Sequence, residues 1–276
     1  MSDLAELCCL ATGGDRRRTE RFALAWKILY TALYMLDSVE DGDVRDAPWA
    51  QWGAGPAINI STGLLASAGA MLSNLEQTGV GADTAQAVRL DFFQTLLDLT
   101  AGQHADLTLQ QPTLEQRWRI AQAKSGALFG LACRSGARLA NAERGVVDQL
   151  SEFGQTLGVL IQIGDDIDGL WAKHGQASDL LAGDRWTLPV AYAMSVLPAA
   201  ERERLHRLLR ATGTDSGAEA EARSQIVAAG AILYLTTEAR RLHRQAHAAL
   251  LQAVPRSAAS DGLLRLLDAY TPLKDL

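Results

Sequence analysis

Apolar residues recur along most of this chain with the period of an α-helix, and residues that break helices are widely spaced. Prolines stand only at positions 48, 56, 112, 189, 198, 255 and 272. The ranges 57–111 and 113–188 therefore contain none, and both are rich in the helix formers Ala, Leu, Gln and Glu. Neither range shows the sustained alternation of a strand. The pattern predicts an all-α protein built from long helices.

Turn-forming residues divide the chain into expected helices. These are residues 19–41, 57–74, a segment from the linker 79–83 to about 109, 113–139, 143–171, a helix after Thr187-Leu188-Pro189, and then 199–211, 218–253 and 260–270. Thr113 and Gln116 have the spacing of a capping box, which marks a helix start. The ranges 42–56 and 172–186 are expected loops. We find no internal repeat and no convincing boundary, so a single domain over residues 1–276 is expected.

Two apolar segments end in clusters of carboxylates. The ten residues before Asp165 carry no charge, and then Asp165, Asp166 and Asp168 follow within four positions. Acids at the end of a buried helix are costly unless a cation balances them, and a divalent metal is a common partner. This cluster therefore indicates a metal site about as strongly as it indicates an ordinary helix end.

A second acidic group lies far upstream. Asp37 and Asp41 are four residues apart and share one face of a helix, with Glu40 beside them. Such a pair is usually a solvated surface, but its neighbours here, Met35 and Val39 among them, are apolar. If the two helices lie side by side, the acids converge into a set suited to Mg²⁺ ions that hold a diphosphate.

Composition excludes several other classes. The 276 residues carry a net charge of −6 with no basic block, which argues against nucleic acid as a partner. No apolar run reaches the roughly 18 residues of a membrane span, and the acidic N-terminus is unlike a signal peptide, so we expect a cytoplasmic protein without a transmembrane segment. Cys8, Cys9 and Cys133 lack metal-ligand spacing, and no nucleophile or nucleotide-binding motif occurs.

Six short motifs stand in order along the chain. They are Asp37-Ser38-Val39-Glu40-Asp41, Gly55-Pro56-Ala57-Ile58-Asn59, Gly102-Gln103-His104-Ala105-Asp106, Lys124-Ser125-Gly126-Ala127-Leu128-Phe129, Ile161-Gln162-Ile163-Gly164-Asp165-Asp166, and Ser178-Asp179-Leu180 with Thr187-Leu188-Pro189. Together they resemble the DDxxD, AIN, GQxxD, KTxxLF, FQxxDD and DL…TLP motifs of the isoprenyl diphosphate synthases, the polyprenyl synthetase family. The resemblance covers nearly the whole chain.

The resemblance implies a bundle of long helices around a deep apolar cavity, the class I isoprenoid synthase fold, usually as a homodimer. It assigns catalysis and the binding of three Mg²⁺ ions to Asp37, Asp41 and Asp165, with Asp166 and Asp106 as supporting metal residues. It places Lys124, Gln162, Arg185, Arg45 and Gln103 around the diphosphate of an allylic prenyl substrate. Mg²⁺ and basic side chains would neutralise the leaving diphosphate, so that the C–O bond ionises in a dry pocket.

The chain departs from the family pattern mainly on the side of the second substrate. Ser38 replaces an Asp of the first motif and Gly169 the last Asp of the second, which leaves Asp168 a doubtful ligand. Family members that elongate chains bind isopentenyl diphosphate with a GGKxxR motif, whereas Gly13-Gly14-Asp15 has an acid at the lysine position and lies only 22 residues before Asp37. The arginine pair after the first motif is reduced to Arg45-Asp46.

The residues for ionising the allylic substrate are kept, whereas those for binding isopentenyl diphosphate are lost. This difference favours a terpene-synthase-like enzyme that ionises one prenyl diphosphate, of fifteen or twenty carbons, and cyclises or quenches the cation. Two alternatives stay open. One is transfer of the prenyl group, to isopentenyl diphosphate or to another acceptor such as a peptide tryptophan. The other is a non-catalytic partner subunit of a synthase, because both Asp-rich motifs are altered.

Overall fold

The computed structural model describes residues 3–41, 49–171, 178–182 and 186–272. Its α-helices are α1 (Leu4–Ala11), α2 (Glu20–Glu40), α3 (Ala54–Leu72), α4 (Ala82–Thr108), α5 (Leu114–Ala121), α6 (Ala127–Leu139), α7 (Arg144–Asp168), α8 (Leu188–Val196), α9 (Ala199–Ala211), α10 (Ser216–Ala228), α11 (Ala231–Ala253) and α12 (Ala258–Tyr270). A π-helix, Gln122–Gly126, joins α5 to α6. The described residues form no strand, which confirms the predicted all-α class.

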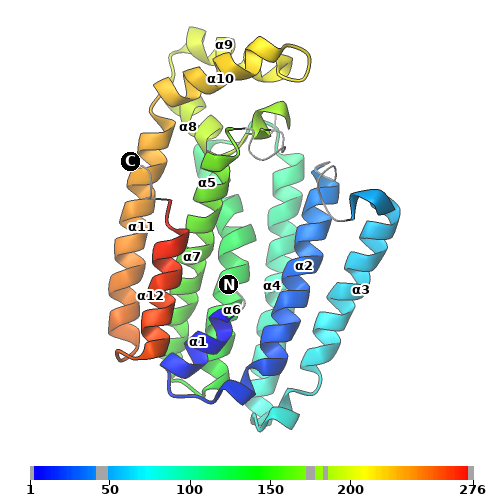
Figure 1. Cartoon of the computed structure of the whole chain (residues 1–276), viewed down its shortest axis with the longest axis vertical. Coiled ribbons are helices and arrows are strands. Elements are labelled where there is room, and N and C mark those ends of the chain that lie inside the picture. The colour runs from blue at the N-terminus through cyan, green and yellow to red at the C-terminus, as the bar shows by residue number, and fades with distance from the viewer. Residues whose placement is uncertain (1–2, 42–48, 172–177, 183–185, 273–276) are drawn as a thin grey trace.

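The helices stand as an up-and-down bundle, in which α2, α4 and α7 run in the same direction (Figure 1). Their C-terminal ends therefore lie together at one end of the molecule, while α3 and α6 return to the other end. The helices α8, α9 and α10 lie beyond the end where α7 finishes, and α8 packs against α5, α7 and α11. This arrangement brings the two expected acidic clusters to the same end of the bundle.

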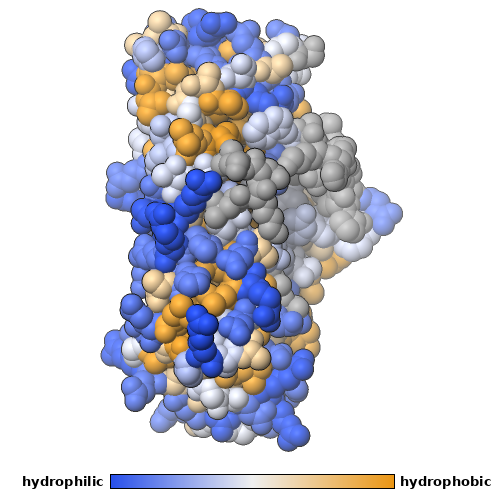
Figure 2. All heavy atoms as spheres, turned by 60° about the vertical axis from the view of Figure 1, so that its left-hand side comes forward, coloured by the Kyte–Doolittle hydropathy of each residue, from blue (hydrophilic) through white to orange (hydrophobic). Residues whose placement is uncertain are grey.

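Three apolar clusters are present among the described residues, the smallest of them formed by Met35, Trp49 and Ala57 at the end of α2. The largest one draws on most of the bundle and includes Phe22, Phe92 and Phe153, each almost fully buried. A smaller core around Val190 and Leu205 lies among α8, α9 and α10. On the side that carries α11, apolar side chains also gather at the surface over these upper helices (Figure 2). The acidic end of α7 contacts α8, where the Leu188 amide donates a hydrogen bond to Asp166.

The structure corrects three expectations about the elements. The range 218–253 is two helices and not one, because Gly230 adopts a left-handed conformation (φ 85°) that ends α10 and begins α11. The helix expected over 113–139 does begin with the capping box of Thr113 and Gln116, but it contains the π-helix. The segment before Gly13, for which no helix was expected, forms α1 and packs against α6 and α12.

One described helix, α2, is long and apolar enough to cross a membrane, contrary to the expectation that no segment would qualify. This is weak evidence for a span, because core helices of water-soluble proteins pass the same test. Here α2 packs along α3, and Trp26 donates a hydrogen bond from Nε1 to the Leu128 carbonyl of α6 at 3.0 Å. The helix is therefore part of the bundle.

Two glycines let α7 lie directly against the backbone that precedes it. A Cβ at Gly154 would stand 2.5 Å from the Phe129 carbonyl oxygen, and one at Gly158 would stand 2.2 Å from the Ser125 carbonyl oxygen. A Cβ atom and an oxygen that are not bonded to each other do not approach so closely. These glycines therefore set the separation between α7 and the segment formed by the π-helix and α6.

We expect Gly154→Ala to destabilise the fold by about 1–3 kcal/mol, because the added methyl group would push two packed backbones apart. Gly145→Ala is the matched control on the same helix, since a Cβ there meets nothing within 4 Å. It should stabilise the protein by up to about 1 kcal/mol through helix propensity. Urea unfolding followed by circular dichroism measures both; equal stabilities of the two variants would contradict the close approach.

Candidate active site

The C-terminal end of α2 presents the first acidic cluster. Asp37 is partly buried, and its Oδ1 forms an ion pair with Lys124 Nζ at 2.9 Å. Ser38, which replaces an acid of the family motif, accepts a hydrogen bond from Trp49 Nε1 at 3.0 Å and donates to the Met35 carbonyl. Ser38 therefore attaches the segment after α2 to the helix. Asp41 ends the helix as its C-cap residue, four positions after Asp37.

Lys124 stands in the π-helix, a local widening that is frequent at functional sites. Its Nζ contacts Asp106 Oδ2 at 2.7 Å as well as Asp37. Burial acts to lower the pKa of Lys124, but the charges of Asp37 and Asp106 outweigh it, so the pKa lies above its ordinary value. Lys124 is therefore charged and joins the acids of α2 and α4.

Asp106 and Arg117 form an ion pair, and the sequence predicted a functional role for only one of the two residues. Asp106 lies near the end of α4, and its Oδ1 pairs with Arg117 Nη1 of α5; both side chains are buried. Asp106 was expected from its motif, whereas Arg117 belongs to none. Arg119, two residues later, is exposed and pairs with Glu115. The two arginines differ only in the face of α5 that each occupies, and the sequence does not show which face points inward. The sequence therefore carried no signal for Arg117.

On α7, Asp166 is fully enclosed while Asp165 reaches solvent on one side. Gln162 Nε2 donates to Asp166 Oδ1 at 2.7 Å, and the Leu188 amide donates to Asp166 Oδ2 at 2.8 Å. Gln162 in turn accepts a hydrogen bond from Ser125 Oγ at 2.7 Å. Burial raises the pKa of Asp166, and the charge of Arg117 with these hydrogen bonds opposes the rise. Both oxygens of Asp166 are thus engaged by the protein.

Asp165 differs because other carboxylates surround it. Burial, followed by the charges of Asp166 and Asp168, raises its pKa to about 6. Burial and the charge of Asp165 also raise the pKa of Tyr30, which lies on α2 two turns before Asp37. The convergence of Asp165 with the acids of α2 stays a prediction.

The structure does not gather all the expected residues. Within the described ranges, no three His, Cys, Asp or Glu side chains are grouped closely enough to hold a metal ion. Gln103 donates to Glu40 Oε2 at 2.8 Å and so lies beside the first cluster. Arg45 and Arg185, expected at the diphosphate, fall outside the described residues.

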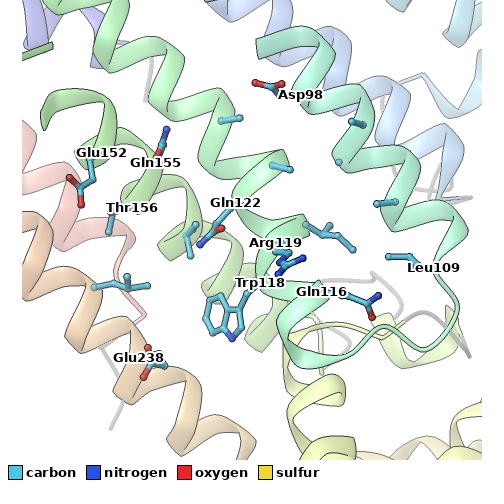
Figure 3. Close-up of a pocket in the computed structure, with 18 of the residues that line it drawn as sticks. Asp98, Leu109, Gln116, Trp118, Arg119, Gln122, Glu152, Gln155, Thr156 and Glu238 are labelled. Atoms are coloured by element: carbon cyan, nitrogen blue, oxygen red, sulfur yellow. The ribbon is translucent and has the colours of Figure 1, made fainter. Parts of the chain in front are cut away.

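A groove of about 1120 Å³ runs across α4, α5, α7 and α11 (Figure 3). Its wall mixes Trp118 with polar side chains such as Gln122 and Glu238, and it contains none of Asp37, Asp41 and Asp165. It is not the apolar hollow that the resemblance places beneath the acids. That hollow stays a prediction.

The loop Gly13-Gly14-Asp15 lies far from these residues. A Cβ at Gly14 would contact Ala140 at the end of α6, and α2 begins only six residues later. Residues 20–37 rise about 26 Å along α2 at 1.5 Å per residue. Asp15 accepts a hydrogen bond from the Arg17 amide and starts a short 3₁₀ turn. This loop therefore belongs to the opposite end of the bundle from Asp37.

Comparison with known proteins gives consistent relatives. The model of the family described as polyprenyl synthetase matches residues 2–227. A geranylgeranyl diphosphate synthase of Mycobacterium tuberculosis is 30% identical over 79% of this chain and 64% of its own length. A (2E,6E)-farnesyl diphosphate synthase of the same organism is 26% identical over 76% of this chain and 60% of its own length. The chain thus spans about three fifths of these relatives.

Solved structures resemble the whole chain. A polyprenyl synthetase from Streptomyces coelicolor A3(2) is 28% identical, with a TM-score of 0.84 over 97% of this chain and 83% of that one. A geranylgeranyl pyrophosphate synthetase from Pyrococcus horikoshii has a TM-score of 0.89 over 99% of this chain and 85% of that one, at 22% identity. The fold is therefore that of the polyprenyl synthases.

The raised pKa of Asp165 predicts a pH-dependent stability. The folded protein holds this proton up to about pH 6, whereas the ordinary pKa is 3.8, so the contribution of Asp165 to the free energy of unfolding falls as pH rises between these values. Asp165→Asn should therefore raise the Tm of the metal-free protein at about pH 7.5, and the gain should shrink toward about pH 4.5. Differential scanning calorimetry with a chelator measures this; a gain independent of pH would contradict it.

Proposed function

Because this chain belongs to the polyprenyl synthetase family, we propose that it ionises an allylic prenyl diphosphate with the help of Mg²⁺ and passes the prenyl cation to an acceptor. The observation that carries the proposal is the contact of one charged lysine, Lys124, with the acids of two motifs, Asp37 and Asp106. In this proposal, Lys124 turns from Asp37 to the diphosphate when a metal ion binds Asp37, while Asp106 keeps the lysine at the site. The relatives' names, all prenyl diphosphate synthases, favour transfer over cyclisation.

The carboxylates divide into two roles in this proposal. Asp37, Asp41 and Asp165 are the metal ligands, because oxygen donors of this kind suit Mg²⁺. Asp106 and Asp166 hold other residues in place, since Asp106 pairs with Arg117 and Lys124, and Asp166 fixes Gln162 and the Leu188 amide. Bound Mg²⁺ would supply positive charge that stabilises the departing diphosphate.

The chain's own donors complete the neutralisation of the leaving group. Lys124 offers the charged amine, and Gln103, Gln162, Arg45 and Arg185 are proposed around the same diphosphate. Gln162 is held by Ser125 and Asp166, so its orientation is set before the substrate arrives. Donors that need no reorganisation stabilise developing charge most effectively.

Two fates of the prenyl cation remain to be distinguished. Isopentenyl diphosphate is the acceptor that we propose, in line with the synthases named above. Cyclisation of the cation is the second candidate, favoured by one observation: the Gly13-Gly14-Asp15 loop carries an acid and stands at the far end of α2 from Asp37. This loop therefore cannot supply the donors that a second diphosphate would need. The cytoplasmic location of the enzyme stays a prediction.

Incubating the protein with Mg²⁺ and allylic diphosphates of ten to twenty carbons, with and without isopentenyl diphosphate, tests the proposal. Diphosphate release that requires isopentenyl diphosphate and yields longer products identifies elongation; hydrocarbon formed without it identifies cyclisation. Asp37→Asn and Asp165→Asn should each lower turnover by about a hundredfold to a thousandfold, the scale of one lost charge-stabilising group, without loss of helicity. No release under any condition, with activation of a partner synthase, would support the non-catalytic reading instead.

We also propose that α3 and α4 form the interface of a homodimer. Leu90, Phe93 and Leu97 lie along one face of α4 and are 63%, 51% and 64% exposed. Phe93 rests against Gly69 of α3, and Ile58 and Ile60 of α3 are exposed as well. An apolar surface shared by two neighbouring helices is typical of a subunit interface.

Leu90→Glu with Leu97→Glu should separate the dimer, because association would bury two uncompensated charges from each protomer. We expect the dissociation constant to rise by at least about tenfold for each glutamate. Leu233→Glu is the control, since Leu233 is 72% exposed but lies on α11. Sedimentation equilibrium measures the association; a monomeric wild-type protein would disprove the interface.

A further inference from the structure

Arg117 is a buried cation that no motif accounts for. Its side chain is 7% exposed, and it directly follows Gln116 of the capping box that begins α5. An arginine is rarely enclosed to this extent unless carboxylates surround it. The structure supplies them, with Asp106 of α4 in direct contact and Asp166 of α7 near enough for the charge of Arg117 to act on it.

Arg117 and Lys124 share one carboxylate. Arg117 pairs with Oδ1 of Asp106, and Lys124 Nζ contacts Oδ2 at 2.7 Å. Lys124 also contacts Asp37 Oδ1 at 2.9 Å. The ion pairs therefore form a continuous chain in the order Asp37, Lys124, Asp106, Arg117. How strongly Asp106 attracts Lys124 depends on how far Arg117 neutralises the Asp106 carboxylate.

The buried carboxylate of Asp106 must be balanced whether or not a substrate is bound. Arg117 already binds one oxygen of Asp106, so Lys124 needs to donate only one hydrogen bond, to the other oxygen. Without Arg117, Lys124 would carry more of the counter-charge of Asp106, and its hydrogens would be drawn toward the protein and away from a ligand.

We propose that Arg117 is a positioning residue that keeps Lys124 available to the diphosphate by neutralising Asp106. Arg117 does so without touching the ligand. The inference rests on the proposed function in one respect, the binding of diphosphate by Lys124.

A double-mutant cycle on the full chain tests the inference without turnover. Calorimetric titration with inorganic diphosphate in the presence of Mg²⁺ gives the affinity of the wild type, Arg117→Met, Lys124→Met and the double variant. Each single change should weaken binding by roughly tenfold, the scale of one charge-assisted hydrogen bond. The double variant should bind no more weakly than Lys124→Met, because Arg117 acts through Lys124.

Arg117→Lys keeps the positive charge and should retain more affinity than Arg117→Met; it also serves if the methionine variant does not fold. Arg134→Met is the matched control, because Arg134 pairs with another carboxylate of α4, Asp91, at 3.4 Å. Arg134→Met should lower the Tm and leave the affinity unchanged.

Equal weakening by the Arg117 substitution in the presence and absence of Lys124 would overturn the inference, as would an unchanged affinity in a folded Arg117→Met protein. Failure of the wild type to bind diphosphate with Mg²⁺ would instead overturn the proposed function. The two failures are therefore distinguishable.

Discussion

A chain of ion pairs from Asp37 through Lys124 and Asp106 to Arg117 joins α2, the π-helix, α4 and α5 at one end of the bundle. Buried charges are stable only with partners in good geometry, so each member constrains the next. The helices that carry them cannot shift independently without leaving a charge unpaired. The same charges that fix this end of the fold are those that a metal–diphosphate complex would rearrange.

Two backbone features make this chain possible. The π-helix changes the facing direction of Lys124 relative to a regular helix, and Gly158 lets α7 approach the carbonyl oxygen of Ser125. That approach lets Gln162 accept a hydrogen bond from the Ser125 hydroxyl while it donates one to Asp166. A local irregularity and a missing side chain thus connect the lysine motif with the second acidic motif.

The two halves of the proposed reaction are unequally represented. On the donor side, Lys124 contacts Asp37 and Asp106, and Gln162 contacts Asp166. On the acceptor side, Gly13-Gly14-Asp15 is part of a turn beside the end of α6. Selection of the acceptor therefore depends on residues other than that loop. This keeps elongation and cyclisation as experimentally separable outcomes of one ionisation step.

The sequence alone determined the all-α class, most helix bounds, and the two acidic clusters with Lys124 and Gln162, because helical periodicity, proline spacing and ordered motifs are local properties. It missed α1, the π-helix and the division at Gly230, where a left-handed conformation was not evident from composition. Only the tertiary structure decided that Arg117 faces inward while Arg119 faces solvent, that both oxygens of Asp166 are engaged, and that Gly14 stands far from Asp37. Each of these depends on contacts between helices distant in sequence, which no local pattern specifies.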